Sequence, residues 1–229
     1  MAKRIVVAID GPAGSGKSTI ARRLAAKLGF LYIDSGAMYR AVGLWALRAN
    51  IDPGDAQRLE QLAREARLEL EPGGARVLLN GEDVSEAIRT PEVSQAASKV
   101  SAIPGVRRAM VDEQRRMAAR SSVVMEGRDI GTVVFPHAEI KIFLDADSAV
   151  RAQRRFEEAA QRGETIDPQE MARQIGERDQ RDRTRSEAPL VQAPDATYVD
   201  STGLSIDQVE EAVLKLIRER TSNGKELTS

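Results

Sequence analysis

The residues between Ile9 and Ile20 have the types and spacing of a loop that binds nucleotide phosphates. They match the pattern G-x-x-x-x-G-K-S/T, and the loop consists of Gly11, Pro12, Ala13, Gly14, Ser15, Gly16, Lys17, Ser18 and Thr19. Glycines at this spacing let backbone N–H groups converge on phosphate oxygens. We expect Lys17 to reach the β- and γ-phosphates and the Ser18 hydroxyl to bind Mg²⁺. The segment therefore predicts a nucleoside triphosphate site, and its alternative is a purely structural glycine turn.

A second group of polar residues, Asp34-Ser35-Gly36, follows the short apolar run that ends at Ile33. Ser35 can contact a hydroxyl or a phosphate, and Arg40, further along the following helix, can reach back as a fork for an anion. Open α/β sheets bind their ligands at this end of a strand. A glycine turn with a surface arginine explains the same residues about equally well.

A third group, Glu126-Gly127-Arg128-Asp129, follows the apolar run Val123-Val124-Met125. Arg128 is suited to grip a phosphate, and Asp129 can accept hydrogen bonds from a base or a sugar. The alternative is a buried structural Arg–Asp pair. We assign no role to Glu126.

The fourth group lies on a predicted helix that contains the run 177–185. At helical spacing Arg178, Arg181, Asp182 and Arg185 share one face. Such faces are usually solvated and carry local salt bridges. Phosphoryl transfer between two anions, however, needs cations that arrive as the site closes, and this face can supply them.

Five strands and six helices position these groups. The apolar runs predict strands at 4–9, 30–33, 122–126, 139–144 and 196–200. Helical spacing predicts helices at 17–28, 37–49, 104–120, 147–162, 168–187 and 205–220. Alternation of strands with helices predicts an α/β fold with a parallel sheet covered on both faces. Residues 55–100 break the alternation, because Leu68-Glu69-Leu70 and Val77-Leu78-Leu79 flank a Pro-Gly-Gly turn and predict a hairpin.

The composition of the chain restricts its expected cellular location and partners. The chain has 229 residues and a formal net charge of −1. Its net charge therefore provides no electrostatic attraction to nucleic acid or to an anionic membrane. It has no cysteine, which excludes thiol chemistry and fits a reducing cytoplasm. No apolar stretch approaches transmembrane length, and because the first strand is predicted to begin at residue 4, we expect no signal peptide. We expect a cytoplasmic protein, acting as a monomer, without nucleic acid or membrane partners.

The order and spacing of the four groups closely resemble those of the bacterial cytidylate kinases, from about Arg4 to Glu219. The resemblance implies a P-loop core of three layers with a five-stranded parallel sheet, a small inserted α+β lobe that binds the nucleoside monophosphate, and a short helical lid. It implies core segments at 1–59, 101–150 and 188–229, the inserted lobe at 60–100, and the lid with its flanking helices at 151–187. The implied activity is transfer of the γ-phosphoryl group of ATP to CMP or dCMP, with Mg²⁺.

The resemblance also assigns roles to residues. Gly11 to Thr19 match the ATP loop. The implied substrate-binding residues are Ser35, Arg40, Ser98, Arg107, Arg128, Asp129, Arg178, Asp182 and Arg185, of which Ser98 and Arg107 match a serine and an arginine that face cytosine. Lys17, Arg128, Arg178 and Arg185 are the implied catalytic cations.

Two other functions share the triphosphate loop. A kinase of another small molecule, such as shikimate, would need a site for a carboxylate-bearing ring. A nucleotide-dependent switch would hydrolyse ATP slowly and be indifferent to monophosphates. The inserted lobe and the Gly-Arg-Asp segment favour the monophosphate kinase over both.

Overall fold

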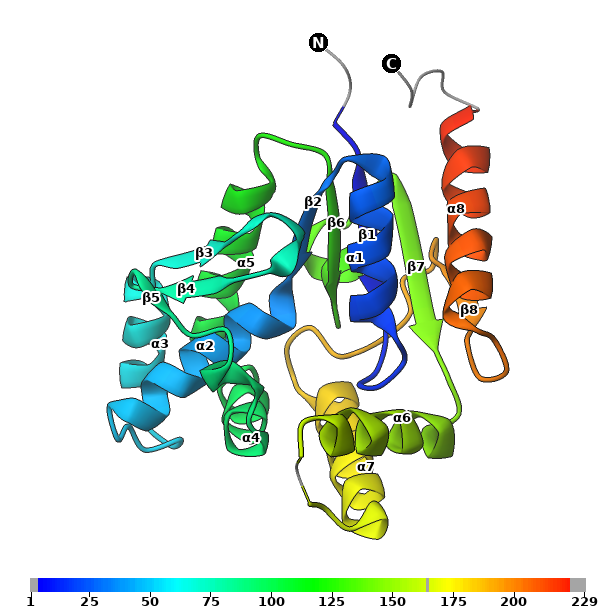
Figure 1. Ribbon diagram of the computed structural model, residues 1–229. Coiled ribbons are helices and arrows are strands. Elements are labelled where there is room, and N and C mark those ends of the chain that lie inside the picture. The colour runs from blue at the N-terminus through cyan, green and yellow to red at the C-terminus, as the bar shows by residue number, and fades with distance from the viewer. Residues whose placement is uncertain (1–3, 164, 223–229) are drawn as a thin grey trace.

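The computed structural model describes residues 4–163 and 165–222. Five parallel strands form the central sheet in the order β2-β6-β1-β7-β8 (Figure 1). In that order the strands are Leu31–Asp34, Val123–Gly127, Val6–Asp10, Ile140–Asp145 and Thr197–Asp200. Each ends within one residue of its predicted end. The predicted α/β fold with a five-stranded parallel sheet is therefore confirmed.

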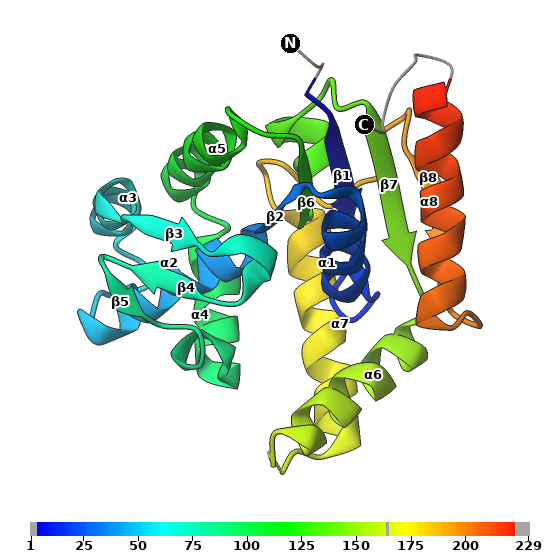
Figure 2. The same ribbon diagram turned by 45° about the horizontal axis from the view of Figure 1, so that its top comes forward.

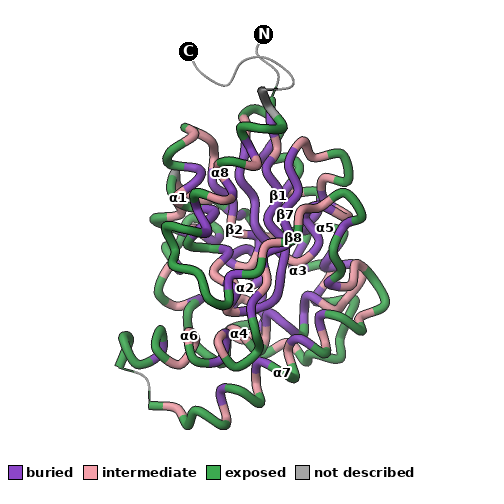
Figure 3. The backbone as a smooth tube through the Cα atoms, turned by 90° about the vertical axis from the view of Figure 1, so that its right-hand side faces the viewer, coloured by how far each residue is buried: buried purple, intermediate pink, exposed green. Residues whose placement is uncertain are grey.

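Helices cover both faces of the sheet because alternate strand residues point to opposite sides. Val7 and Ile9 of β1 pack in one cluster with residues of α1 (Lys17–Leu28) and α8 (Ile206–Ser222). Ala8, between them, packs in the other cluster, with α2 (Ser35–Arg48) and α5 (Pro104–Ala118). The strands at the centre of the molecule are accordingly buried along most of their length (Figure 3).

The segment between α2 and α5 forms a small α+β unit beside the sheet. The predicted hairpin is confirmed, since β3 (Leu68–Leu70) and β4 (Val77–Leu79) pair antiparallel. Helices α3 (Ala56–Glu65) and α4 (Pro91–Val100) were not predicted. The remaining short elements are η1 (Pro72–Gly74), β5 (Glu82–Asp83) and η2 (Ala87–Arg89).

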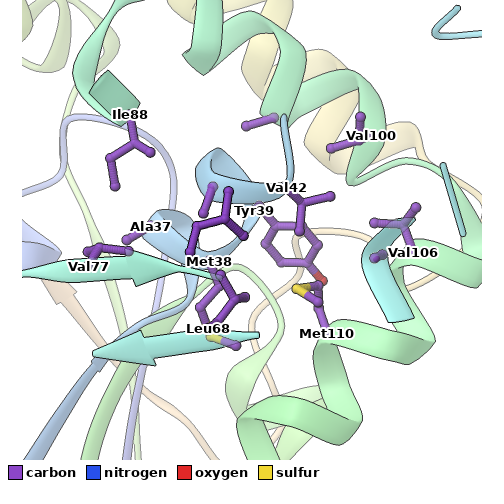
Figure 4. Packing of buried hydrophobic residues seen from close by; sticks show 14 of the residues in the cluster. Ala37, Met38, Tyr39, Val42, Leu68, Val77, Ile88, Val100, Val106 and Met110 are labelled. Carbon is purple, nitrogen blue, oxygen red and sulfur yellow. The ribbon is translucent and has the colours of Figure 1, made fainter. Parts of the chain in front are cut away.

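A shared apolar core joins this unit to the rest of the molecule. Met38 and Val42 of α2 pack in one cluster with Leu68 and Val77 of the hairpin and with Met110 of α5 (Figure 4). Hairpin and helices therefore have a common buried face, which fixes the unit against α2.

Two further helices, α6 (Ser148–Gln161) and α7 (Pro168–Thr184), form a hairpin beyond the carboxyl ends of the strands (Figures 1 and 2). Their contact is a small separate cluster that includes Ala159 and Ile175. Helix α7 ends at Thr184, three residues earlier than predicted, because Arg185 takes an extended conformation. Among the described residues, no helix is both long and apolar enough to cross a membrane.

Candidate active site

The predicted phosphate loop connects β1 to α1 as expected. Gly11 lies against β7 so closely that a Cβ there would be 1.9 Å from the carbonyl oxygen of Leu144, so only glycine fits. Gly16 caps α1 with a φ of 91° and no side-chain hydrogen bond. The first N–H groups of α1 therefore stay free of a side-chain acceptor, as an anion site at a helix N-terminus requires.

Lys17 is folded back onto its own loop. Its Nζ donates to the carbonyl oxygen of Pro12 at 2.5 Å and to Ser15 Oγ at 3.3 Å, and the residue is buried. Burial, and then the charge of Arg128, lowers the pKa of Lys17 to about 7. The loop thus holds a cation whose charge an incoming anion would stabilise.

Glu126, to which sequence reasoning gave no role, faces this loop from the end of β6. Its carboxylate accepts a 2.7 Å hydrogen bond from the Tyr32 hydroxyl, and Ser18 is among the groups that influence its ionisation. Burial, and then the charge of Asp34, raises the pKa of Glu126. The position of Glu126 directly after an apolar strand was the available signal, but its partners come from two other elements.

Arg40 and Ser35 lie at the end of β2, beside the same opening. Arg40 is half-buried and its guanidinium lies 3.1 Å from the Asp34 carboxylate. The buried Ser35 hydroxyl donates to the carbonyl oxygen of Glu126 at 2.7 Å, which joins β2 to β6. Arg40 is therefore held by its own strand end rather than extended into solvent.

Asp182 of α7 gathers three arginines around one buried carboxylate. Arg128 Nε donates to it at 2.9 Å, Arg178 Nε lies 4.0 Å from it and Arg185 Nη1 lies 3.9 Å from it. Arg178 Nε and Arg185 Nη2 are buried without a hydrogen-bond partner among the described residues. Burial, and then the charge of Arg128, lowers the pKa of Arg178 to about 9. Buried N–H groups without an acceptor are unusual, and here they suit an anionic ligand.

Asp129 pairs with a different arginine from its sequence neighbour Arg128. Its carboxylate bonds to the buried guanidinium of Arg107 and lies 3.8 Å from Arg185. Arg107 also donates to the carbonyl oxygen of Ser101, at the end of α4, at 3.0 Å. In the same helix, Ser98 Oγ accepts a 2.6 Å hydrogen bond from Arg181 of α7. A buried Arg–Asp pair thus exists, but its arginine is Arg107, and it joins α5 to the segment that follows β6.

Most of these residues line one cleft, with a volume of about 380 Å³. Gly11, Pro12 and Ser15 do not line it, because they are buried beneath the loop surface. The predicted site residues that it brings together are Ala13, Gly14, Gly16, Lys17, Ser18, Thr19, Ser35, Arg40, Ser98, Arg107, Arg128, Asp129, Arg178, Asp182 and Arg185. Residues from many separate elements and loops thus face one space that has a phosphate loop at one end and several arginines at the other.

The donor set near Ser18 fits Mg²⁺. Among the described residues there is no cluster of three or more histidines or carboxylates that could enclose a metal by itself. Mg²⁺ is typically held by one or two protein oxygen ligands, waters and substrate phosphates rather than by an all-protein cage. The Ser18 hydroxyl and the Glu126 carboxylate, which line the same cleft, are such ligands.

Comparison with known proteins gives a consistent result. The family described as cytidylate kinase matches residues 7–219. A protein of Solibacter usitatus named cytidylate kinase is 61% identical over 99% of this chain and 97% of its own length. One of Pelotomaculum thermopropionicum with the same name is 52% identical over 96% of each. A solved structure of an uncharacterized protein from Eubacterium ventriosum matches with a TM-score of 0.53 at 13% identity, over 93% of this chain and 98% of that one. This match shows a similar fold and nothing further.

Proposed function

This chain belongs to the cytidylate kinase family, and we propose on that premise that it transfers the γ-phosphoryl group of ATP to CMP or dCMP. The products are ADP and CDP or dCDP. The observation that carries the proposal is the single cleft in which Lys17 and the Asp182 arginines, meaning Arg128, Arg178 and Arg185, face one space. A switch that only hydrolyses ATP would have no need for the second group of cations.

The reaction requires positioning and charge neutralisation rather than a strong base. A phosphate oxygen of the monophosphate attacks the γ-phosphorus of ATP, a new P–O bond forms, and the bond to the β-phosphate oxygen breaks as ADP leaves. Because the attacking oxygen of a dianionic phosphate carries no proton, no side chain must remove one. The protein contributes by holding both anions and spreading the negative charge of the transferred group.

Lys17 and the Asp182 arginines are suited to this work in different ways. Lys17 serves the triphosphate from within its loop. Arg178 offers a buried Nε without a partner, and Arg128 can exchange its hydrogen bond with Asp182 for one with a phosphate. Since Arg178 and Arg185 come from α7 and its end, movement of the α6–α7 hairpin would bring or withdraw their charges, which supports its role as a lid.

For Mg²⁺, Ser18 and Glu126 are the proposed protein ligands, directly or through water. When bound, the ion neutralises charge on the β- and γ-phosphates. The task of Glu126 is to hold its carboxylate toward Ser18, and the hydrogen bond from Tyr32 fixes it there.

Each segment of the chain has its own proposed role. We propose that the unit at 60–100 binds the monophosphate, that 151–187 is the lid, and that 1–59, 101–150 and 188–229 form the core. Arg40 and Ser35 would bind the phosphate of CMP, and Ser98, Arg107 and Asp129 its base. We also propose a cytoplasmic monomer without nucleic acid or membrane partners, for which light scattering at the monomer mass of 25.0 kDa is the expected result.

One assay tests the proposal. ATP and Mg²⁺ are supplied with CMP, dCMP, UMP, AMP or shikimate, and ADP release is measured by a coupled reaction. Rapid turnover with CMP and dCMP is expected. ATP hydrolysis that is independent of any acceptor would favour the switch, and turnover with shikimate alone would favour the other kinase.

A further inference from the structure

Arg181 and Ser98 join the two sides of the cleft. Arg181 lies on α7 and Ser98 on α4, and Arg181 Nη1 donates a 2.6 Å hydrogen bond to Ser98 Oγ across 83 residues of sequence. In both ribbon views α4 lies to the left of α7, on the side of the inserted unit (Figures 1 and 2). Ser98 is only 5% exposed and lines the cleft. The contact is therefore located where the inserted unit meets the proposed lid.

The chemistry of this contact restricts the orientation of the serine hydroxyl. A guanidinium has only donors, so Ser98 Oγ must be the acceptor of the bond. Among the described residues, Ser98 Oγ makes no second hydrogen bond. Its proton is consequently available to a ligand in the cleft, whereas the orientation that turns the proton toward Arg181 and a lone pair toward the ligand is disfavoured by the guanidinium.

The neighbouring groups have fixed polarity as well. Arg107 presents only donors, and the Asp129 carboxylate, held by Arg107, presents only acceptors. Arg107 bonds to the carbonyl oxygen of Ser101, one turn beyond Ser98 in the same helix region. This end of the cleft thus offers two donors and one acceptor to a base.

Cytosine and uracil differ in their pattern of hydrogen-bond donors and acceptors. Cytosine carries an amino donor at C4 and an acceptor at N3, whereas uracil has an acceptor at O4 and a donor at N3. With the amino group on Asp129, the donors of Ser98 and Arg107 meet the acceptors of cytosine. Uracil in the same orientation would direct O4 at a carboxylate and N3–H at a donor.

We propose that Arg181 is a positioning residue that enforces selection of cytosine over uracil by holding Ser98 as a hydrogen-bond donor. Without Arg181, the Ser98 hydroxyl can rotate and accept from N3–H of uracil, which removes one of the two mismatches. The inference rests on the proposed function, because it concerns the base of the proposed substrate. It adds a residue that does not itself touch the base.

The test is the ratio of kcat/KM for CMP to kcat/KM for UMP. Arg181→Met removes the donor while keeping an unbranched side chain on the helix. We expect the ratio to fall about tenfold, the effect of one misdirected hydrogen bond. Arg183→Met, an exposed arginine on the same helix, is the matched control and is expected to leave the ratio unchanged.

A double-mutant cycle separates positioning from a general loss of structure. Ser98→Ala should lower the ratio, and Arg181→Met on that background should lower it no further, within about twofold. Additive effects, or an unchanged ratio in Arg181→Met, would overturn the inference. Should Arg181→Met not fold, Arg181→Lys replaces it. Because lysine also has only donors, this variant is expected to keep a higher ratio than the Ser98→Ala variant. Equal ratios in the two variants would overturn the inference. Absence of CMP turnover in the wild-type enzyme would instead refute the proposed function.

Discussion

Arg128 and Asp182 tie the end of β6 to α7 across 54 residues of sequence. The hydrogen bond from Arg128 Nε to the carboxylate is 2.9 Å long, and the side chains are 18% and 7% exposed. Since Arg178 and Arg185 approach the same carboxylate, Asp182 is the common counter-ion of three cations. The Asp182 carboxylate therefore balances the positive charge of these arginines. An anionic substrate would compete with it for their N–H groups.

Asp182→Ala is expected to lower both stability and activity. Removing the carboxylate leaves neighbouring arginines without their counter-ion, which should cost about 3 kcal/mol in the free energy of unfolding. It should also lower kcat/KM for CMP and dCMP, because the arginines lose their orientation. Urea denaturation and steady-state kinetics measure the two effects. Glu177→Ala, an exposed acid on α7, is the control, and equal effects at the two positions would contradict the account.

Arg178→Ala is expected to lower kcat on the order of 10³-fold while changing the Kd for ATP little, because a cation that acts mainly in the transition state contributes to rate rather than to binding. The same substitution at Arg185 should act in the same direction. Rapid-quench kinetics and ATP titration separate the two quantities. Arg173→Ala, on the exposed part of α7, is the control. An unchanged kcat would exclude the substituted arginine from the catalytic set.

Glu126→Gln is expected to raise the Mg²⁺ concentration needed for half-maximal activity and to lower kcat about 10- to 100-fold. The amide keeps the size of the side chain but removes its charge beside Ser18. Tyr32→Phe removes only the hydrogen bond to Glu126, so its effect should be smaller and in the same direction. The measurement is kcat as a function of free Mg²⁺. A Mg²⁺ requirement equal to that of the wild type would separate Glu126 from the metal.

The parts of the fold that local signals encode could be predicted from the sequence. Helix α1 begins and ends as predicted, because Gly16 and Gly29 both take left-handed conformations at its ends. Helix α3 carries comparable signals, because Asp55 caps its first turn and Leu59 and Leu62 are buried at helical spacing. The π-helix η3 (Ile130–Val134) lacked them, because the acceptor for its first N–H groups is Asp10, 120 residues away.

For the site, residue types were predictable but partners were not. Helical spacing places Arg178, Arg181 and Asp182 on one face of the predicted helix. It does not reveal that Arg181 reaches Ser98 on another helix or that Arg128 bonds to Asp182. Those pairings depend on how the α6–α7 hairpin and the inserted unit meet beyond the carboxyl ends of the strands. The roles of the site residues stay predictions until the substitutions are measured.

Gly43→Ala is expected to displace α4 from α2. A Cβ at Gly43 would lie 2.8 Å from the backbone nitrogen of Ala97, the residue before Ser98. Overpacking of this kind costs about 1–3 kcal/mol, and the shift of Ser98 should raise KM for CMP more than it lowers kcat. Gly176→Ala is the control, since no atom lies within 4 Å of a Cβ there. Because alanine has the higher helix propensity, this substitution should raise the free energy of unfolding by up to about 1 kcal/mol. Destabilisation by both substitutions would point to helix effects rather than to packing.

Asp10 links the phosphate loop to the Arg128–Asp129 segment through η3. Its buried carboxylate accepts the backbone N–H groups of Ile130 and Gly131 at 2.8 and 2.7 Å. Burial raises the pKa of Asp10 from 3.8 to about 6, so the folded state binds this proton more tightly than the unfolded chain does. The resulting stabilisation is complete below about pH 3.8 and is lost as the pH rises through about 6.

Asp10→Asn removes this titration, so the difference in unfolding free energy between the wild type and the variant should depend on pH. We expect the wild type to gain stability relative to Asp10→Asn as the pH falls from 8 to 5, with most of the gain below pH 6. Urea denaturation of both proteins at several pH values measures it. Groups that titrate alike in the two proteins cancel in the difference. A difference that stays constant, or that favours the wild type more at high pH, would show that folding does not raise the pKa of Asp10.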